Sequence, residues 1–364
     1  MMRVLRPAVF LLCLVALTPA AAVEVQGLYE AEVEQAERTE QARRQAVRAA
    51  LERVLVKVTG HAALDESLQP LVKGAERYVQ RFRFQAVEEP EAGTSEAEDL
   101  PAGRLQVRFD REAILEALRQ RGQPVWPATR PRTAVWLAVE DGGGRRLVGG
   151  NGNDPWGAAL RAQAGARGLP VAVPLMDLED RSRVEPADIW GGFRGVIEDA
   201  SERYGAQAIL VGRAFRTGGG TWRARWALYQ GNSDLRWEAR GATPEAVAAA
   251  GIDGAAEALA KRFAQVYGAG TTGGMTLEVT GVTDLAAYRR IIDYLGGIDG
   301  VAGVRVLSVS PDRLRCRLDL EVAARNIVQT IGLGTVLEEA GTAETEAAPP
   351  PEGAAVARRY RLSP

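Results

Sequence analysis

The 364-residue chain is long enough for two or three domains, and its formal net charge is −2. A mildly acidic chain is not a general ligand for nucleic acid or anionic membranes, so we predict no nucleic-acid partner. Cys13 and Cys316 are the only cysteines, and an N-terminal cleavage after residue 22 would leave Cys316 alone, which excludes an intrachain disulfide.

Residues 1–22 have the pattern of a secretory signal peptide. Arg3 and Arg6 precede an apolar stretch at 8–17, and three alanines at 20–22 fit a cleavage site. The alternative is an uncleaved anchor, but the apolar stretch is short for a membrane span. We therefore expect the mature chain to begin at Val23, to lie in the bacterial periplasm, and not to span the membrane.

Residues 23–122 predict a small α+β domain. The alternation of apolar residues predicts strands at 25–33, 81–87 and 104–109, and helical spacing predicts helices at 39–59 and 66–80. Gly60 is expected to end the first helix, and Asp110 to cap a short helix that ends at Gly122. An acidic Pro/Glu/Gly loop at 88–103 joins the last two strands, and a Pro-rich linker at 123–131 follows.

Residues 132–267 predict a central α/β domain with an antiparallel hairpin extension. Continuous apolar runs at 133–140 and 206–212 indicate strands that are covered on both faces. Helices are expected from Asp154-Pro155 to about 167 and from 244 to 267, with further strands at 169–175 and 234–240 and a Gly-rich loop at 142–152.

A stretch at 186–230 organises this domain. Asp188 is expected to cap a helix whose apolar face continues to Tyr204, and Gly205 to stop it in a left-handed conformation. Three glycines in this helix, Gly191, Gly192 and Gly195, suggest close packing on a neighbour. Residues 221–229 alternate, which places Trp222, Ala224, Trp226 and Leu228 on one face and Arg223, Arg225 and Tyr229 on a wet face.

Residues 268–274 form a Gly-rich linker, and 275–364 predict a C-terminal ferredoxin-like domain. Its expected elements are strand 275–282, helix 285–297, strands 302–310 and 313–321, helix 323–333 and a final strand at 356–362. A loose Ala/Glu/Pro-rich insert at 340–355 precedes the last strand. The fold class is therefore multidomain, with α+β and α/β parts.

Residues with catalytic potential are few. His61 follows a helix end, and Cys316 lies in the middle of a strand, so neither fits a nucleophilic triad. The glycines at 142–152 could cradle an anion or form a flexible loop. Five acids cluster after a strand, and they could bind calcium, act as acid and base, or neutralise Arg181 and Arg183: Asp177, Glu179, Asp180, Glu185 and Asp188. We predict no catalytic residue, no metal site and no cofactor.

All seven tryptophans lie between 126 and 237, in the linker and the central domain. Trp190 stands beside two glycines, where it could pack in the core or be exposed at a groove that suits a protein or a glycan. The candidate partner-binding residues are Trp190, Trp222, Arg223, Arg225 and Trp226.

Four stretches together resemble the proteobacterial family catalogued as domain of unknown function 2066. They are ALERVLVKVTG at 50–60, PVWPATRPRTAVWLAVEDGGGRR at 124–146, IWGGF at 189–193 and RYGAQAILVGR at 203–213. The resemblance implies a secreted envelope protein and carries no known catalytic residues. The domain order is similar to that of flagellar assembly protein T, and the strand and hairpin at 203–229 look like the amino-terminal domain of TolB and the lipoprotein activators of penicillin-binding proteins. Those relatives are binding and assembly proteins.

Three functions follow as hypotheses. The first is a non-enzymatic assembly, scaffolding or regulatory partner whose contact surface lies on the central domain and whose ligand is an envelope protein. The second is a module that binds peptidoglycan or another envelope polymer through exposed Trp and Arg. The third is a hydrolase that uses Glu179, Asp180 or Glu185.

Overall fold

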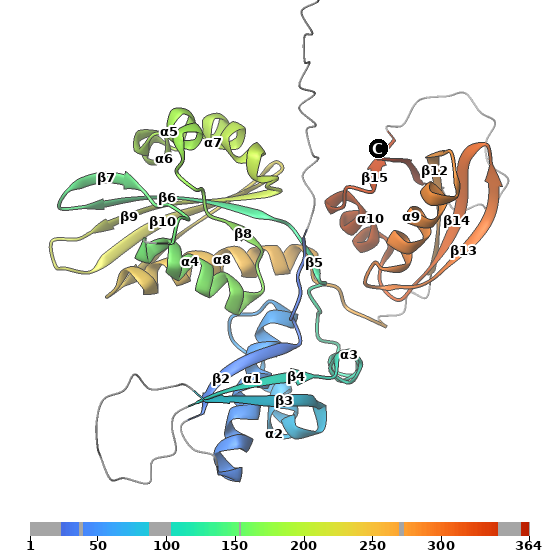
Figure 1. The fold of residues 1–364 in the computed structure, drawn as a ribbon, viewed down its shortest axis with the longest axis horizontal. Coiled ribbons are helices and arrows are strands. Elements are labelled where there is room, and N and C mark those ends of the chain that lie inside the picture. Colours follow the sequence, from blue (N-terminus) through green and yellow to red (C-terminus); the bar gives the residue numbers. More distant parts are fainter. Residues whose placement is uncertain are drawn as a thin grey trace, which may run out of the picture.

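A computed structural model of the chain describes residues 23–35, 39–86, 103–152, 154–268, 273–340 and 358–363. Helices and several separate sheets confirm the multidomain α+β fold class (Figure 1). The expected signal peptide, nearly all of the acidic loop at 88–103 and nearly all of the insert at 340–355 lie outside the described residues.

The N-terminal unit has a three-stranded antiparallel sheet in the order β2-β4-β3. The strands are β2 (Glu30–Gln35), β3 (Val79–Ala86) and β4 (Gly103–Phe109), and the long helix α1 (Glu40–Thr59) packs on them. Gly60 ends α1 with a φ of 77°, and Asp110 caps α3 (Arg111–Arg119), as predicted. The predicted strand at 25–33 is too long, because Gly27 turns the chain before Glu30.

The predicted helix at 66–80 is divided into three short pieces. They are η1 (Glu66–Leu68), α2 (Gln69–Lys73) and η2 (Ala75–Tyr78). Pro70 is the second residue of α2, and the non-helical backbone of Gly74 ends this piece. Proline lacks the amide that a continuous helix needs, and glycine is a poor helix former, so these two residues explain the divisions.

The central sheet has the order β11-β10-β9-β6-β7. Strands β6 (Thr133–Asp141) and β9 (Ala208–Arg216) are parallel neighbours, and β10 (Trp222–Gln230) and β11 (Ser233–Gly241) extend the sheet antiparallel. The predicted Gly-rich loop instead contains β7 (Gly144–Leu147), which forms a hairpin with β6. The predicted strand at 169–175 is only β8 (Val171–Ala172), which pairs with the start of β6.

Helices cover both faces of this sheet (Figure 1). On one face lie α4 (Pro155–Arg167) and α8 (Pro244–Phe263), and their apolar side chains form one core with Val135, Leu137 and Val139 of β6. On the other face lie α5 (Leu178–Arg183), α6 (Pro186–Gly191) and α7 (Arg194–Ser201), around Ala134, Trp136 and Ala138. β6 and most of β9 are buried from both sides, which confirms the prediction from their continuous apolar runs.

The single helix predicted from Asp188 to Tyr204 is wrong. The helix starts at Pro186, where Glu185 and Asp188 form a reciprocal capping box, so Asp188 is not the first cap. Gly192 then takes a left-handed φ of 71° and separates α6 from α7. A side chain at Gly192 or Gly195 would meet nothing within 4 Å, so close packing does not explain these two glycines. Gly192 permits a backbone turn that other residues adopt at a cost.

The C-terminal unit follows the expected strand-helix-strand-strand-helix-strand order. Its elements are β12 (Gly273–Val282), α9 (Leu285–Gly296), β13 (Val301–Ser310), β14 (Asp312–Leu320), α10 (Ala324–Leu333), β15 (Leu337–Glu339) and β16 (Arg358–Leu362). β16 runs parallel to β12, and the unpredicted β15 lies outside it. The sheet, in the order β13-β14-β12-β16-β15, therefore has one strand more than the predicted ferredoxin-like unit.

Arg130 joins the N-terminal and central units. Its side chain is fully buried, and it lies 3.9 Å from the ring centre of Trp126. The guanidinium donates five hydrogen bonds to carbonyl oxygens, those of Lys57, Trp126, Pro127, Arg167 and Gly168, at 2.8–3.1 Å. Burial lowers the pKa of Arg130 to about 9, so the group stays charged at neutral pH. Arginine is the side chain with five N–H donors, arranged in a planar fork, so it can satisfy five carbonyls at once.

We predict that Arg130→Met lowers the free energy of unfolding by about 3–5 kcal/mol, because it leaves buried carbonyl oxygens without a donor. Equilibrium urea unfolding followed by tryptophan fluorescence measures this change. The matched control is Arg132→Met, at an exposed position two residues away, where the expected change is below about 0.5 kcal/mol. Equal effects of the two substitutions would contradict the role given to Arg130.

Candidate functional site

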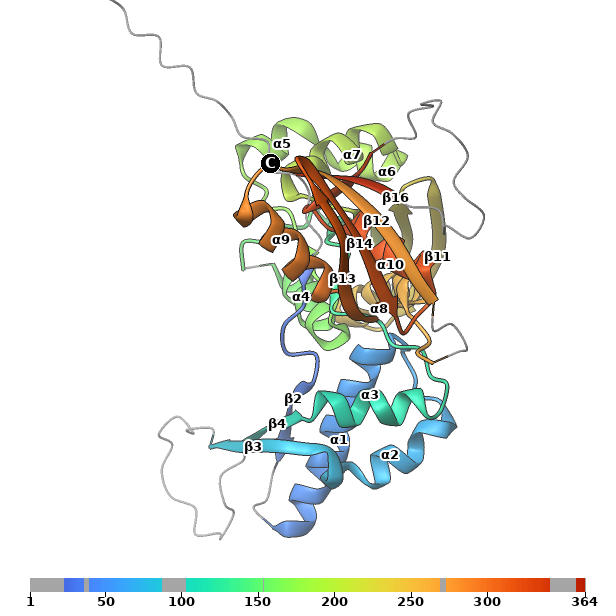
Figure 2. The same cartoon turned by 90° about the vertical axis from the view of Figure 1, so that its right-hand side faces the viewer.

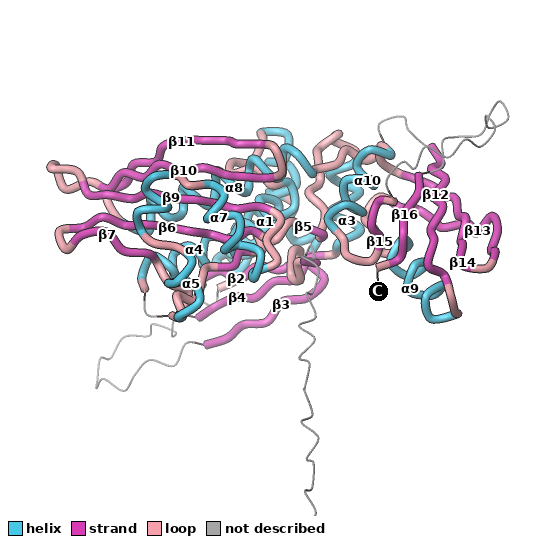
Figure 3. The backbone as a smooth tube through the Cα atoms, turned by 90° about the horizontal axis from the view of Figure 1, so that it is seen from above, coloured by secondary structure: helices cyan, strands magenta, loops and turns pink. Residues whose placement is uncertain are grey.

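A groove of about 490 Å³ opens on the central sheet, beside the end of α6. Gly191 and Gly192 form one wall, and β9, β10 and β11 supply the rest. Its floor includes the buried side chains of Val211 and Tyr229. Figure 3 shows the sheet from the side of α5–α7, with β11 at its outer edge. The groove therefore lies where the helices of this face give way to open sheet.

Arginines from three neighbouring strands line this groove. Arg213 of β9 pairs in register with Arg225 of β10, which in turn pairs with Glu238 of β11. Arg225 donates to the Glu238 carboxylate at 3.0 Å, and Arg213 donates to the Trp190 carbonyl at 2.7 Å. Like charges directly opposite each other on a sheet are unfavourable, and the Glu238 carboxylate beside Arg225 offsets part of the cost of the Arg213–Arg225 pair.

The predicted candidate residues divide between this groove and the core. Arg225 lines the groove and is exposed, and Arg223 lies on the same face, two residues away along β10. Trp190 is half-buried beside the groove, covered by the guanidinium of Arg145 at 4.2 Å from its ring centre. The groove thus brings together Arg225, the backbone of Trp190 and the glycines that follow it.

Two of the candidates are not surface residues of this face. Trp226 is 1% exposed, and its ring packs on the opposite side of the sheet, where a side chain at Gly251 of α8 would clash with it. Trp222 also lies on that side, with its ring edge-to-face against Trp156 at 5.1 Å. Trp226 is among the residues that line the groove, although its ring fills the core between β10 and α8. Contact between Trp226 and a partner therefore stays a prediction.

Sequence reasoning missed Arg213 and Arg236, which line the same groove. The apolar run at 206–212 drew attention to burial, and the strand was expected to end at Gly212. The strand continues to Arg216, and its alternation beyond Gly212 puts Arg213 on the same face as Arg225. The alternation of residues 213–216 is the sequence feature from which the position of Arg213 could have been predicted.

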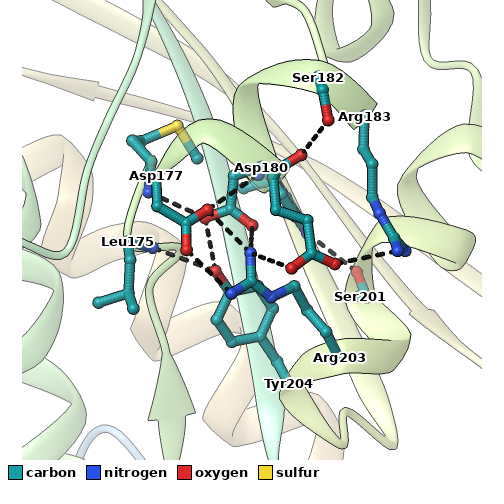
Figure 4. Close-up of polar contacts among 11 residues, drawn as sticks. Leu175, Asp177, Asp180, Ser182, Arg183, Ser201, Arg203 and Tyr204 are labelled. Carbon is teal, nitrogen blue, oxygen red and sulfur yellow. Dashed lines mark hydrogen bonds and ion pairs between the residues drawn. The ribbon is translucent and has the colours of Figure 1, made fainter. Parts of the chain in front are cut away.

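The acidic cluster after β8 is a closed polar network (Figure 4). Asp180 is fully buried and accepts hydrogen bonds from the Met176 amide, the Tyr204 hydroxyl at 2.6 Å and Arg203 at 2.9 Å. Asp177 accepts two bonds from Arg203, at 2.9 and 3.0 Å. These bonds hold the Arg203 guanidinium and keep the pKa of Asp177 at about 2.

This network joins α5 to the short helix η3 (Glu202–Tyr204), and its carboxylates are already occupied. Glu179 pairs with Arg183 at 2.9 Å, whereas Glu185 and Asp188 close the capping box of α6. Burial, and then the bond to Asp180, raises the pKa of Tyr204 to about 12. Within the described residues no group of three or more His, Cys, Asp or Glu could hold a metal ion. The geometry favours the self-neutralising interpretation of this cluster.

Other candidate chemical groups are placed as follows. His61 is exposed just after α1, and Cys316 is fully buried in the C-terminal sheet. Burial raises the pKa of the Cys316 thiol to about 11, the opposite of what a nucleophilic thiolate requires. In the Gly-rich segment, Asp154 caps α4 and binds Arg146 at 2.6 Å, so a carboxylate occupies the helix start that an anion would need.

Comparison with protein families identifies one match. Residues 22–127 match the family described as Domain of unknown function (DUF8605). This segment holds the N-terminal sheet and its helices, so an uncharacterised domain is shown there. No curated protein matches the chain. None of the helices that the structure describes combines the length and apolar character that a membrane crossing requires.

We predict that Asp177 makes the fold sensitive to acid. Its pKa is lowered from 3.8 to about 2 in the folded chain, so its stabilising effect is fully present above about pH 4 and is lost as the pH falls through 2. Asp177→Asn keeps the side-chain cap of α5 and removes the charge. The thermal midpoint of this variant should fall below that of the wild type at pH 6, and the difference should disappear near pH 2.

Asp199→Asn is the control, because Asp199 is exposed on α7 and makes no ion pair within the described residues. Its thermal midpoint should follow that of the wild type at every pH. A constant difference between Asp177→Asn and the wild type across the whole pH range would contradict a role for the Asp177 charge.

Proposed function

We propose that the chain is a non-enzymatic protein of the bacterial periplasm that acts as an assembly, scaffolding or regulatory partner in the cell envelope. The groove between α6 and β9–β11 is its contact surface. The observation that carries this proposal is the row of arginines from three strands around an apolar floor, next to glycines that leave the α6 wall open.

The groove suits an extended segment with both acidic and apolar side chains. Arg213, Arg225 and Arg236 already donate to the Trp190 carbonyl, to Glu238 and to Asp234, respectively. Their remaining guanidinium donors are left for the carboxylates of a partner. Phe193 is 57% exposed and packs beside Gly191 at the rim, where it adds an apolar contact. Aromatic and arginine side chains together are typical of the residues that contribute most to protein interfaces.

The sequence supports an envelope location. Residues 1–22 have the signal-peptide pattern, and the DUF8605 match begins at residue 22, beside the expected mature start at Val23. The resemblance to the domain of unknown function 2066 family, and the more distant ones to flagellar assembly protein T and TolB, point in the same direction. The more distant resemblances are fold-level analogies and give the class of role, not a particular partner.

A peptidoglycan or other envelope-polymer binding module is the second candidate. The same arginines favour it, because the peptide stems of the cell wall carry carboxylates that a guanidinium can bind. The third candidate, a carboxylate-dependent hydrolase, has less support, because Asp180 and Glu179 are held in ion pairs with Arg203 and Arg183.

We predict that Arg225→Glu reduces recovery of the partner about tenfold, which corresponds to about 1.4 kcal/mol of binding free energy. The measurement is crosslinking in the native cell, followed by purification of the chain and quantification of the crosslinked proteins. Arg225 is exposed, so its replacement should leave folding intact. Arg48→Glu makes the same charge change on an exposed position of α1, away from the groove, and should leave recovery unchanged.

Sedimentation with purified cell-wall sacculi separates the two candidates. Recovery of a defined envelope protein that depends on Arg225, without pelleting of the chain by sacculi, supports the protein partner. Pelleting by sacculi that Arg225→Glu abolishes supports the polymer-binding module. If neither crosslinking nor pelleting responds to Arg225→Glu, the groove is not the contact surface.

A further inference from the structure

The C-terminal sheet has an open face that carries a high density of arginine. Helices α9 and α10 pack on one side of the sheet, against Leu277, Leu314 and Leu318. Figure 2 shows the strands of this sheet in front of α10, on the side away from the other two units. Within the described part of the chain no helix covers this second face.

Six arginines from three strands point to this face. The alternation along each strand separates them from the core residues, and they are Arg305 on β13, Arg313, Arg315 and Arg317 on β14, and Arg359 and Arg361 on β16. Three acids share the face, namely Glu278, Asp319 and Glu338. Between the arginine rows of β14 and β16, the central strand β12 offers the small residues Gly274, Thr276 and Thr280.

Several of these arginines lack an acidic partner. Glu278 is shared by Arg313 and Arg359, at 3.6 and 3.7 Å, and Asp319 binds Arg305 at 3.1 Å. Among the described residues, Arg315, Arg317 and Arg361 make no ion pair. The face therefore carries an excess of positive charge that the chain itself does not neutralise.

The arrangement of the arginines costs stability. Arg305 and Arg317 are direct cross-strand neighbours, and such like-charged pairs are unfavourable. The guanidinium of Arg317 lies against Gly274. A Cβ atom at position 274 would come within 2.3 Å of the Arg317 Nε atom. Gly274 is the second residue of β12, and its lack of a side chain makes room for the arginine. These features are better explained by an external anion than by internal packing.

The exposed apolar side chains of the edge strand β13 do not add to this face. Val306 and Val309 pair with the buried residues Cys316 and Leu314 and so point to the helix side of the sheet, and Leu307 lies at a break in the register. The open face is therefore mainly cationic, and a concentration of cationic side chains on one surface is typical of proteins that are attracted to an anionic bilayer. Single-stranded nucleic acid would need aromatic platforms for stacking, and the described residues of this face include none.

We propose that this arginine face binds the surface of a bilayer that contains anionic phospholipids. The arginines of this face contact the phosphate groups of the lipids. The overall charge of −2 conceals this property, because the positive charge is concentrated on one face of one unit. The inference does not depend on the groove of the central sheet and leaves it free for another partner.

The test uses the chain from Val23 onward, which holds every described residue. It is mixed with phosphatidylcholine vesicles, with or without a quarter of phosphatidylglycerol, and the bound fraction is measured by flotation. We expect binding to the anionic vesicles only, and weaker binding as the salt concentration rises. Arg315→Glu together with Arg317→Glu should weaken binding at least tenfold, because each arginine near an anionic surface contributes about fivefold.

The matched control is Arg81→Glu together with Arg83→Glu, two exposed arginines with the same spacing on β3 of the N-terminal sheet. It makes the same change in charge and should leave vesicle binding unaltered, and circular dichroism checks that both variants are folded. Equal binding to neutral and anionic vesicles, no binding to either, or loss of binding only in the control pair would each overturn the proposal. The proposal would also be overturned if the chain bound a single-stranded oligonucleotide but did not bind anionic vesicles.

Discussion

The C-terminal end of α1 is the contact on which the rest of the structure depends. The last carbonyl groups of a helix have no partner inside it, and they carry the negative end of the helix dipole. Here they are bound from outside the N-terminal unit: Lys57 by Arg130, Val58 by the Trp126 amide and Gly60 by Arg167. Gly60 also lies so close to α8 that a side chain there would collide with Ala260. One helix end therefore docks the first unit on the second.

This docking places the two candidate surfaces on one body. The Pro-rich segment 123–131 packs into the junction, where β5 (Thr129–Arg130) pairs with β1 (Val23–Glu24). Asp299 attaches the C-terminal unit, because it binds Arg111 at 2.5 Å and accepts from the Ala128 amide at 2.9 Å. The groove lies on the central sheet and the arginine face lies on the C-terminal sheet, so each surface can bind a different ligand. A chain built in this way could hold a partner near a bilayer surface.

Sequence reasoning predicted what local patterns encode. The apolar runs of β6 and β9 identified buried strands, the alternation in β10 put Arg225 on the open face, and Asp154, Asp110 and Gly60 marked helix ends. The predictions from sequence were incomplete or wrong where contacts between distant segments determine the role of a residue. Nothing near Arg130 in the sequence marks a buried arginine, because its partners come from three separate segments. Gly192 was interpreted as a packing residue, although its role is a left-handed turn. Arg213 was missed because its strand was expected to end one residue earlier.

The central claim is that the N-terminal and central units open together because α1 is anchored at Arg130. Hydrogen exchange, read by mass spectrometry on the chain from Val23 onward, tests it most directly. We predict that the amides of α1 between Val47 and Val58 are protected to the same degree as those of β6 and β9, since their opening requires the shared junction to open. Faster exchange in α1, while β6 and β9 stay protected, would show that the first unit opens alone and would contradict the claim.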